Sequence, residues 1–358
     1  MMKGKGSSET PVVPPARGVH RLALLSVCLV WPLIWVGGLV TTYDAGMAVP
    51  DWPGTYGYNL FLYPLDTWLF GPFDLFIEHG HRLLGAVVGL IAILIVAAAH
   101  RHEPRQWVRF LSIGLLLMVI AQGLLGGLRV VLSDRTLAMV HGCVGPAFFS
   151  LCVAATVVTS RLWWRKIETE DSQMFHGRGH VLLAGMILIF SYSQVILGAR
   201  VRHVLPDAAP SEFTTTVAQH VSIACLLWIL SLVGFYRFRR CGDLTLSQPI
   251  LALLVSVTLQ IALGVGTWVV NYGWPGILGA KFIQSIPGAT GYLIRAKGFW
   301  DSIIVTAHVA VGSLILAVSV MVLLRLLRSR YLQLTSKTPD LPSENETISP
   351  VQMGQAFS

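Results

Sequence analysis

The stretch Leu75-Phe76-Ile77-Glu78-His79-Gly80-His81-Arg82-Leu83-Leu84-Gly85 opens a long apolar run. On a helix Glu78 and His81 share one face, because they lie three residues apart, and Gly85 lies one turn further along. A charge at the centre of a membrane helix costs roughly 2.5–3.5 kcal/mol on insertion scales, so these groups need an explanation. An interfacial ion pair of Glu78 with Arg82, beside a solvated histidine, is one explanation. The stretch alone leaves it open, but the same design returns three more times.

The composition of the 358-residue chain is that of a polytopic membrane protein. Hydrophobic residues make up 54% and charged residues 12%, the mean hydropathy is +0.66, and windows of about 20 apolar residues recur. We predict an all-α protein with eight transmembrane helices, over about residues 21–42, 75–99, 107–131, 136–160, 180–202, 214–236, 248–271 and 301–327. The net charge of +8 then reflects basic residues along one membrane face, and no nucleic-acid partner is expected.

The distribution of basic residues predicts the orientation. Seventeen lysines and arginines flank the spans on one side and eight on the other, which puts both termini in the cytoplasm. Residues 1–20 and 328–358 are predicted to be cytoplasmic tails, the first disordered, and nothing near the N-terminus resembles a cleaved signal peptide. The five cysteines form no Cys-x-x-Cys pair, so neither a disulfide framework nor a zinc site is indicated, and each is expected to be a small buried residue.

The first outer loop, residues 43–74, is long and carries four aspartates and no basic residue. It is also rich in aromatic residues, namely Tyr43, Trp52, Tyr56, Tyr58, Phe61, Tyr63 and Trp68. A loop of this length and composition is rarely a mere linker, so we expect it to fold back as a lid.

A helix hairpin recurs four times. The even-numbered spans each carry one histidine near the outer end with a small residue four positions later: His81 with Gly85, His141 with Gly145, His220 with Ala224, and His308 with Gly312. Three odd-numbered spans share Gln-x-x-Leu-Gly, at Gln122–Gly126, Gln194–Gly198 and Gln260–Gly264, whereas the first has Trp35-Val36-Gly37-Gly38. Two hairpins make a four-helix bundle. The chain is therefore predicted to form two pseudo-symmetric halves, residues 21–165 and 166–327.

Four histidines at equivalent depth suggest metal ligands. A single membrane histidine more often makes a helix–helix hydrogen bond, but imidazole is also an axial ligand of haem iron, and a small residue one turn away leaves room for a flat macrocycle. Even-numbered helices run the same way, so two histidines of one half can face each other. The pattern suggests two haems, one between His81 and His141 and one between His220 and His308.

The other histidines are predicted to lack such a role. His20, His100, His102, His176 and His180 lie at cytoplasmic ends and are expected to be solvated. His79 points roughly 200° around the helix from His81. His203 lies in an outer loop, where it is either without function or in contact with a haem edge.

Four outer arginines, Arg82, Arg129, Arg200 and Arg202, cluster where haem propionates would emerge. A guanidinium binds a carboxylate through a bidentate fork, and contact with lipid headgroups is the alternative. The fourth hairpin lacks such an arginine, so Arg295 or Lys297 in the last outer loop is the candidate there.

Taken together, the sequence resembles the haem A synthase family over nearly all eight spans. The resemblance rests on Ala45-Gly46-Met47-Ala48-Val49-Pro50-Asp51-Trp52-Pro53, Glu78-x-x-His81-Arg82, Gly126-Gly127-Leu128-Arg129 and the histidines at 141, 220 and 308. It implies a haem b cofactor held by His220 and His308, and haem O as the substrate near His81, His141 and Glu78. Some members carry a cysteine pair in the first outer loop; this chain has none between Tyr43 and Arg82, so a mechanism that depends on that pair is excluded.

The resemblance implies oxidation of one methyl group of haem O to a formyl group, giving the haem A of terminal oxidases. It further implies a bacterial plasma membrane location, and haem O synthase, oxidase assembly factors and an unidentified electron acceptor as partners. Double oxidation of a methyl group gives a geminal diol, which must lose water. Glu78 is the catalytic candidate, because proton transfer or a negative charge would help these steps.

Two other functions remain open. A di-haem b-type cytochrome that moves electrons from quinol would need the same four histidines, but neither Glu78 nor a long outer loop. A transporter with a histidine-lined path would have broken helices and charges at the midplane.

Overall fold

The computed structural model describes residues 16–164, 177–204, 209–240, 244–274 and 298–335. Eight of its helices are long and apolar enough to cross a membrane, as predicted, and the protein is a multi-pass membrane protein. They are α1 (Arg17–Thr42), α3 (Phe73–His102), α4 (Gln106–Val131), α5 (Arg135–Thr159), α7 (Arg178–Arg202), α8 (Pro210–Arg240), α9 (Leu244–Tyr272) and α11 (Phe299–Thr335). Three short helices, η1 (Ala45–Met47), α2 (Leu65–Leu69) and α6 (Arg161–Trp164), complete the set, and the described residues contain no β-strand.

The helix ends follow local chemistry and extend past several predicted ends. The side chain of Asp134 caps α5 by accepting a hydrogen bond from the backbone N–H of Leu137 at 2.9 Å. Basic residues occupy the last turns of α3 and α8, where they favour the negative end of the helix dipole. α1 begins at Arg17, inside the predicted tail, and α11 continues to Thr335, beyond the predicted end at 327.

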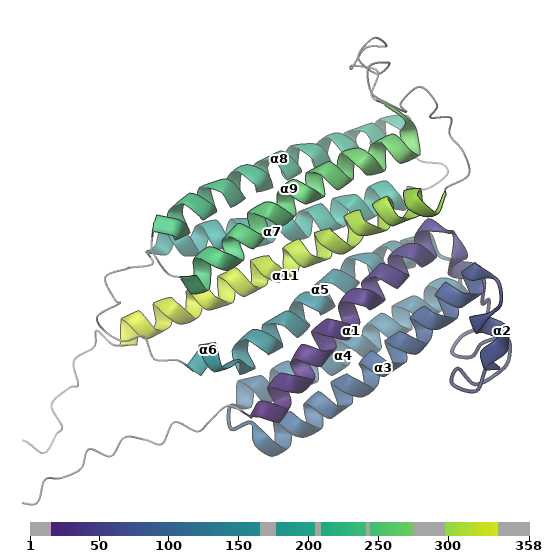
Figure 1. Ribbon diagram of the computed structural model, residues 1–358, viewed down its shortest axis with the longest axis horizontal. Helices are drawn as coiled ribbons and strands as arrows, with labels where there is room; N and C mark the ends of the chain where they lie inside the picture. Colours follow the sequence, from purple (N-terminus) through teal and green to yellow (C-terminus); the bar gives the residue numbers. More distant parts are fainter. Residues whose placement is uncertain (1–15, 165–176, 205–208, 241–243, 275–297, 336–358) are drawn as a thin grey trace, which may run out of the picture.

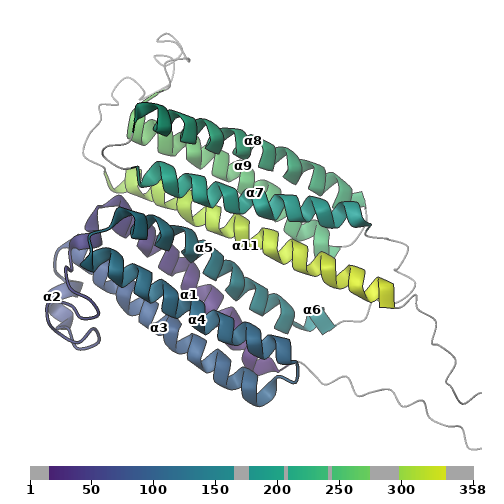
Figure 2. The ribbon, with the colours of Figure 1, turned by 180° about the vertical axis from the view of Figure 1, so that it is seen from behind.

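The long helices form two groups of four (Figures 1 and 2). In one, α3 contacts α1 and α4, and α5 closes the ring by contacting the same two helices. In the other, α8 contacts α7 and α9, and α11 closes the ring in the same way. The groups meet through α1, α5, α7 and α11. Each group encloses its own apolar core, centred on residues such as Leu115 and Phe149 in the first and Ile187 and Leu253 in the second.

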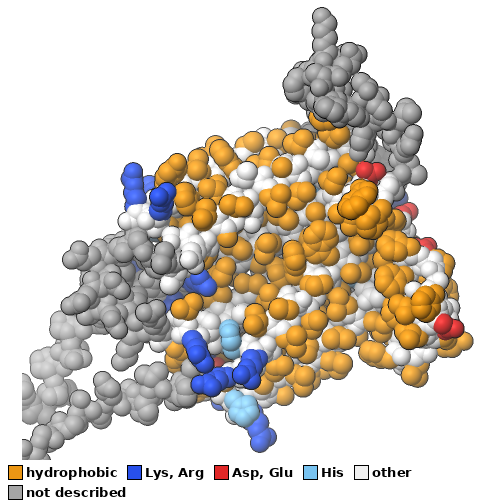
Figure 3. Space-filling view, in the orientation of Figure 1, with side chains coloured by type: hydrophobic (Ala, Val, Ile, Leu, Met, Phe, Trp, Pro, Cys, Tyr) orange, Lys and Arg blue, Asp and Glu red, His pale blue; other side chains and the backbone are white. Residues whose placement is uncertain are grey.

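The surface has the distribution that a bilayer requires. Hydrophobic side chains cover the long sides, whereas lysine and arginine gather at the end opposite α2 and acidic residues at the end that carries α2 (Figure 3). Leu117 and Ile189, for example, are exposed on the helix surfaces. Cys143 and Cys152 are buried as predicted, but the prediction was wrong for Cys28 and Cys225, which face outward. Cys241 lies outside the described residues.

Candidate functional site

The four predicted histidines form two pairs. The ring centroids of His81 on α3 and His141 on α5 lie 6.5 Å apart with an interplanar angle of 83°. Those of His220 on α8 and His308 on α11 lie 6.2 Å apart at 69°. The Nδ1 atom of each of the four rings is buried and lacks a hydrogen-bond partner. Buried polar atoms normally have a hydrogen-bond partner or a metal. These four unpaired nitrogens therefore mark two places where a bound group would supply the missing interaction.

A glycine from a neighbouring helix packs against each imidazole. A Cβ atom added to Gly37 would lie 2.8 Å from Cε1 of His81, and one added to Gly126 would lie 3.1 Å from Cε1 of His141. In the second group, the corresponding distances are 3.3 Å from Gly198 to His220 and 3.1 Å from Gly264 to His308. Such distances are shorter than an ordinary carbon–carbon contact of about 3.5–4.0 Å. A methyl group at Gly37 would therefore force the ring of His81 to move, and one at each of the other three glycines would require a shift of a few tenths of an ångström.

The glutamine of the Gln-x-x-Leu-Gly motif fixes the backbone of the same histidine. The side-chain amide of Gln194 donates to the carbonyl of His220 at 2.7 Å. Gln260 donates to the carbonyl of His308 at 2.8 Å, and Gln122 to that of His141 at 3.3 Å. The motif thus holds a histidine at two points, through its backbone and its ring. The first span, which lacks the glutamine, keeps the glycine, and the backbone of Leu33 contacts the ring of His81 instead.

The small residue four positions after each histidine has varied surroundings. A Cβ added to Gly312 would lie 3.1 Å from the amide nitrogen of Gln260, and one added to Gly145 would lie 3.9 Å from that of Gln122. At Gly85 nothing lies within 4 Å. Gly312 therefore makes room for Gln260, whereas a side chain at Gly145 would only be in ordinary contact with Gln122. The prediction that the small residues accommodate a macrocycle stays a prediction.

Glu78 and Arg82 form an ion pair that holds the first outer loop. Glu78 is only 2% exposed, so a solvated interfacial pair is the wrong description. One carboxylate oxygen lies 2.7 Å from Arg82, and the other accepts the backbone N–H of Val49 at 2.8 Å. Arg82 also donates to the carbonyls of Val49, Asp51 and Gly54 at 2.7, 2.6 and 3.0 Å. Both terminal nitrogens of Arg82 are therefore engaged with the loop, which gives this arginine a role besides the predicted propionate contact.

His79, which the sequence analysis set aside, anchors the same loop. Its side chain is 1% exposed, and its Nδ1 lies 3.0 Å from the hydroxyl of Thr55. The rings of Tyr63 and Trp68 pack on it with centroids at 5.2 and 4.9 Å. The aromatic residues of the loop could have indicated this contact. A buried histidine that points away from His81 still needs a partner, and the loop supplies one.

The loop also contacts α4 at the Gly126-Gly127-Leu128-Arg129 motif. A Cβ on Gly127 would collide with the ring of Trp52, and one on Gly46 would lie 2.7 Å from the guanidinium of Arg129. Asp51 shapes the loop by accepting the N–H groups of Tyr56 and Gly57 at 2.8 and 2.9 Å. Burial raises the pKa of Asp51, but these hydrogen bonds and the charge of Arg82 outweigh it and lower the pKa below its ordinary value. The loop therefore covers the N-terminal end of α3 and the C-terminal end of α4, as a lid would.

The other outer arginines are in different environments. Arg200 is exposed and lies 3.4 Å from Glu212. Arg202 donates to the carbonyl of Gly38 at 2.9 Å and to the hydroxyl of Thr42 at 2.7 Å, which ties α7 to α1. The guanidinium of Arg129 packs against Gly46 and interacts electrostatically with the carboxylate of Glu78. Arg295 and Lys297, the candidates for the fourth hairpin, lie outside the described residues.

Several of the remaining histidines are not simply solvated. His20 hydrogen-bonds the hydroxyl of Thr159 at 3.2 Å, and His180 packs on Phe238, and both are half-buried, so their solvation is only partial. His203 is held neutral, because burial and then the charges of Arg202, Arg129 and Arg135 lower its pKa to about 4. His100 and His102 are exposed as predicted, and His176 lies outside the described residues.

Comparison with known proteins decides the family. Residues 20–216 match the COX15-CtaA family of cytochrome oxidase assembly proteins. The chain belongs to this family. A heme A synthase from Shouchella clausii (strain KSM-K16) is 30% identical over 271 residues, which cover 67% of this chain and 83% of that protein. The predicted resemblance is thereby confirmed. The family match includes Glu78, His81 and His141 and ends shortly before His220.

The paired histidines fit the group that this family implies. Two metal–imidazole bonds of about 2.0–2.1 Å each would together span about 4 Å. The distance from each ring centroid to its own nitrogen accounts for the remainder of the centroid separations of 6.5 and 6.2 Å. The described residues contain no group of three or more His, Cys, Asp or Glu side chains that could hold a metal ion alone. Two protein ligands per metal, with the other positions supplied by a macrocycle, match this donor set.

Proposed function

We propose that this protein is a membrane haem A synthase, which oxidises a methyl group of haem O to a formyl group for the assembly of terminal oxidases. The family and the name of the relative support this. The observation that carries it is an asymmetry between the histidine pairs. Glu78 precedes His81 by three residues, whereas Ala138, Val217 and Val305 occupy the same position before the other three histidines.

The first pair is the proposed substrate site. His81 and His141 would hold haem O, with Gly37 and Gly126 against their rings and Gln122 on the backbone of His141 to keep the imidazoles oriented. The lid over α3 and α4 excludes water from the outer side. Arg129 and Arg202 are the proposed partners of the propionates, since Arg82 and Arg200 already have carboxylate partners.

Glu78 is the proposed catalytic residue. Its carboxylate is buried beside His81 and fixed by Arg82 and the N–H of Val49. A carboxylate in this position can take a proton from the substrate's hydroxylated carbon, stabilise positive charge there, and help the geminal diol lose water. The oxidation removes electrons from the methyl carbon, so an electron acceptor is a further proposed partner.

The second pair, His220 and His308, is the proposed binding site of a resident haem b, which would supply one-electron transfer. We propose that residues 21–165 and 166–327 form pseudo-symmetric halves, with both termini in the cytoplasm of a bacterium whose plasma membrane holds the protein. Haem O synthase and oxidase assembly factors are the proposed protein partners.

The experiment is to replace Glu78 by glutamine, which keeps the size and the acceptor for Val49 but removes the charge. General acid–base catalysis contributes typically about 10²–10⁴-fold, so haem A should fall sharply while haem O or a hydroxylated form accumulates. Wild-type protein and the variant are expressed with a supply of haem O, and the extracted haems are separated by mass.

Glu103→Gln is the matched control. Glu103 is also buried, at 1% exposure, and is paired with Arg105, but it lies at the opposite end of α3 from His81. Haem A production should survive this change. Equal production by Glu78→Gln and wild type would reduce Glu78 to a structural partner of Arg82.

A di-haem cytochrome is the second candidate, favoured by the near-equal spacing of the two histidine pairs. It predicts no haem A from wild type even with an electron acceptor and oxygen present. The transporter alternative has no such support, because each of the eight described spans is an unbroken helix.

A further inference from the structure

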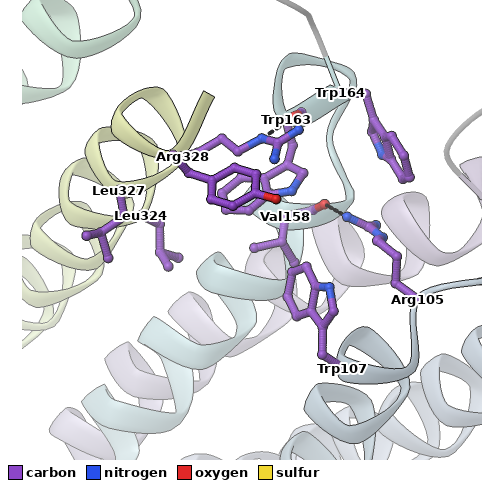
Figure 4. A pocket seen from close by; sticks show the side chains of 9 residues that line it. Arg105, Trp107, Val158, Trp163, Trp164, Leu324, Leu327 and Arg328 are labelled. Carbon is purple, nitrogen blue, oxygen red and sulfur yellow. Dashed lines mark hydrogen bonds between the residues drawn. The ribbon is translucent and has the colours of Figure 1, made fainter. Parts of the chain in front are cut away.

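A cavity of about 500 Å³ lies at the end of the molecule opposite the lid, where the two helix groups meet. Arg105 and Trp107 line it from the start of α4, Trp163 and Trp164 from α6, and Arg328 and Tyr331 from α11 (Figure 4). Aromatic and basic residues in this combination are typical of the membrane–water interface. The cavity is far from both histidine pairs and has no part in the proposed oxidation.

Arg105 is a structural part of the wall. Its Nε and one terminal nitrogen donate to the buried carboxylate of Glu103 at 2.6 and 3.0 Å. The other terminal nitrogen donates to the carbonyl of Val158 at 3.0 Å, and the guanidinium lies 4.4 Å from the ring centroid of Trp164. Every nitrogen of Arg105 is thus engaged, and its charge is neutralised.

Arg328 is different. Among the described residues, only its Nε is engaged, donating to the carbonyl of Trp163 at 3.1 Å. Its guanidinium carbon lies 5.4 Å from the ring centroid of Trp163 and 5.7 Å from that of Tyr331, and no carboxylate among the described residues pairs with it. A guanidinium fixed by a carbonyl and two rings, whose two terminal nitrogens meet no acceptor in the described part of the chain, suits a phosphate group.

The rest of the wall is apolar. Leu327 directly precedes Arg328 and Leu324 lies one turn closer to the centre of α11, and both line the cavity together with Val158 of α5. A ligand that fits must therefore carry an anionic head beside Arg328 and a hydrocarbon part beside the leucines. We propose that this cavity binds an anionic phospholipid, with its phosphate on Arg328 and an acyl chain along Leu324 and Leu327. The gathering of basic side chains at this end of the molecule would favour such a lipid over a zwitterionic one (Figure 3).

The lipid would also join the two helix groups. α4, α5 and α6 supply one side of the cavity and α11 the other. A ligand that binds only the folded arrangement raises its stability by mass action, so the melting temperature should rise with lipid concentration.

The test uses the full-length protein, delipidated in detergent and titrated with phosphatidylglycerol or phosphatidylcholine, with bound lipid counted by native mass spectrometry. We expect one phosphatidylglycerol to be retained per chain, with phosphatidylcholine at least tenfold weaker. A hydrogen bond to a charged group contributes about 1.5–3 kcal/mol, so Arg328→Gln should weaken phosphatidylglycerol binding about tenfold or more. It should also abolish the lipid-dependent rise in melting temperature.

Arg325→Gln is the matched control, since Arg325 lies one turn away on α11 and donates instead to the carbonyl of Thr245 at 2.8 Å. It should bind lipid as wild type does. If Arg328→Gln fails to fold, Arg328→Lys keeps the charge but loses the fork, and Trp163→Leu removes the ring beneath it; each should weaken binding. Equal retention of both lipids, or unchanged binding in the Arg328 variants, would overturn the proposal. Displacement of the lipid by millimolar inorganic phosphate would assign the site to a free anion instead.

Discussion

Replacing the four glycines that touch the histidines should weaken haem binding in a graded order. In Gly37→Ala the new methyl group would lie 2.8 Å from Cε1 of His81, about 0.7 Å inside the shortest ordinary carbon contact of about 3.5 Å. The deficit is about 0.4 Å at Gly126 and Gly264, where the distance is 3.1 Å, and about 0.2 Å at Gly198, where it is 3.3 Å.

The cost should appear in haem binding more than in folding. An unligated imidazole can rotate away from the new methyl group, but one bound to iron on a rigid macrocycle cannot. Overpacking costs typically about 1–3 kcal/mol, which corresponds to about 5- to 150-fold in affinity. We therefore expect Gly37→Ala near the upper part of this range for haem O. Gly126→Ala should follow for haem O and Gly264→Ala for haem b, and Gly198→Ala should stay within about fivefold of wild type.

Haem titrations of the purified variants, followed by absorbance, give the affinities. Gly114→Ala is the control, since nothing lies within 4 Å of its added methyl group on α4. Every variant gains the same helix propensity, about 1 kcal/mol in soluble helices, so differences among them report the contact. Wild-type affinity in Gly37→Ala would refute the reasoning. Equal loss of both haems in all four variants would instead point to general misfolding.

Three further changes test single contacts. His308→Ala should remove most haem b while the protein stays folded in the membrane, and an unchanged low-spin spectrum in both this variant and His220→Ala would contradict the assignment. Thr55→Val deletes the hydroxyl that bonds His79 and should loosen the lid by about 1 kcal/mol, seen as faster hydrogen exchange in residues 49–58; unchanged exchange would mean that the aromatic rings suffice. Gln194→Leu removes the second hydrogen bond to the carbonyl of His220, which keeps its bond within α8, at a cost of about 0.5–1.5 kcal/mol, so the haem b spectrum and the melting temperature should both change, and wild-type values for both would be the contrary result.

The sequence alone predicted the eight helices and which histidines meet. Both predictions came from repeats in the sequence. Apolar windows long enough to cross a bilayer recur along the chain, and one histidine recurs on each helix that runs in the same direction. Gln-x-x-Leu-Gly was visible as a repeat, but its role was not. A glutamine that bonds a histidine carbonyl on the next helix depends on how two helices face each other, and helix spacing along the chain does not encode that.

The lid contacts were harder to predict, because they join a non-repeating loop to a helix end. Arg82 was expected at a propionate, yet it donates to three loop carbonyls. His79 was excluded by its angle from His81, although that angle is what points it at Thr55. Helical geometry predicts the direction in which a side chain points. The partner that it meets there belongs to an irregular loop, whose fold no sequence repeat predicts.

The departure of the first span from the repeat bears on how the two sites differ. Leu33 stands where the other three odd-numbered spans have glutamine, so the backbone of His81 lacks the hydrogen bond that holds His141, His220 and His308. The same helix instead uses Gly38 and Thr42 to bind Arg202 across the boundary between the two groups. Both histidines of the second pair thus have a glutamine on their backbone carbonyl, whereas in the first pair only His141 does. A resident cofactor benefits from two rigid ligands, but a substrate must arrive and leave.

Introducing the missing contact with Leu33→Gln should therefore slow haem release from the first site. Pulse–chase exchange of labelled haem O would measure this change. An unchanged exchange rate would show that the lid alone controls release.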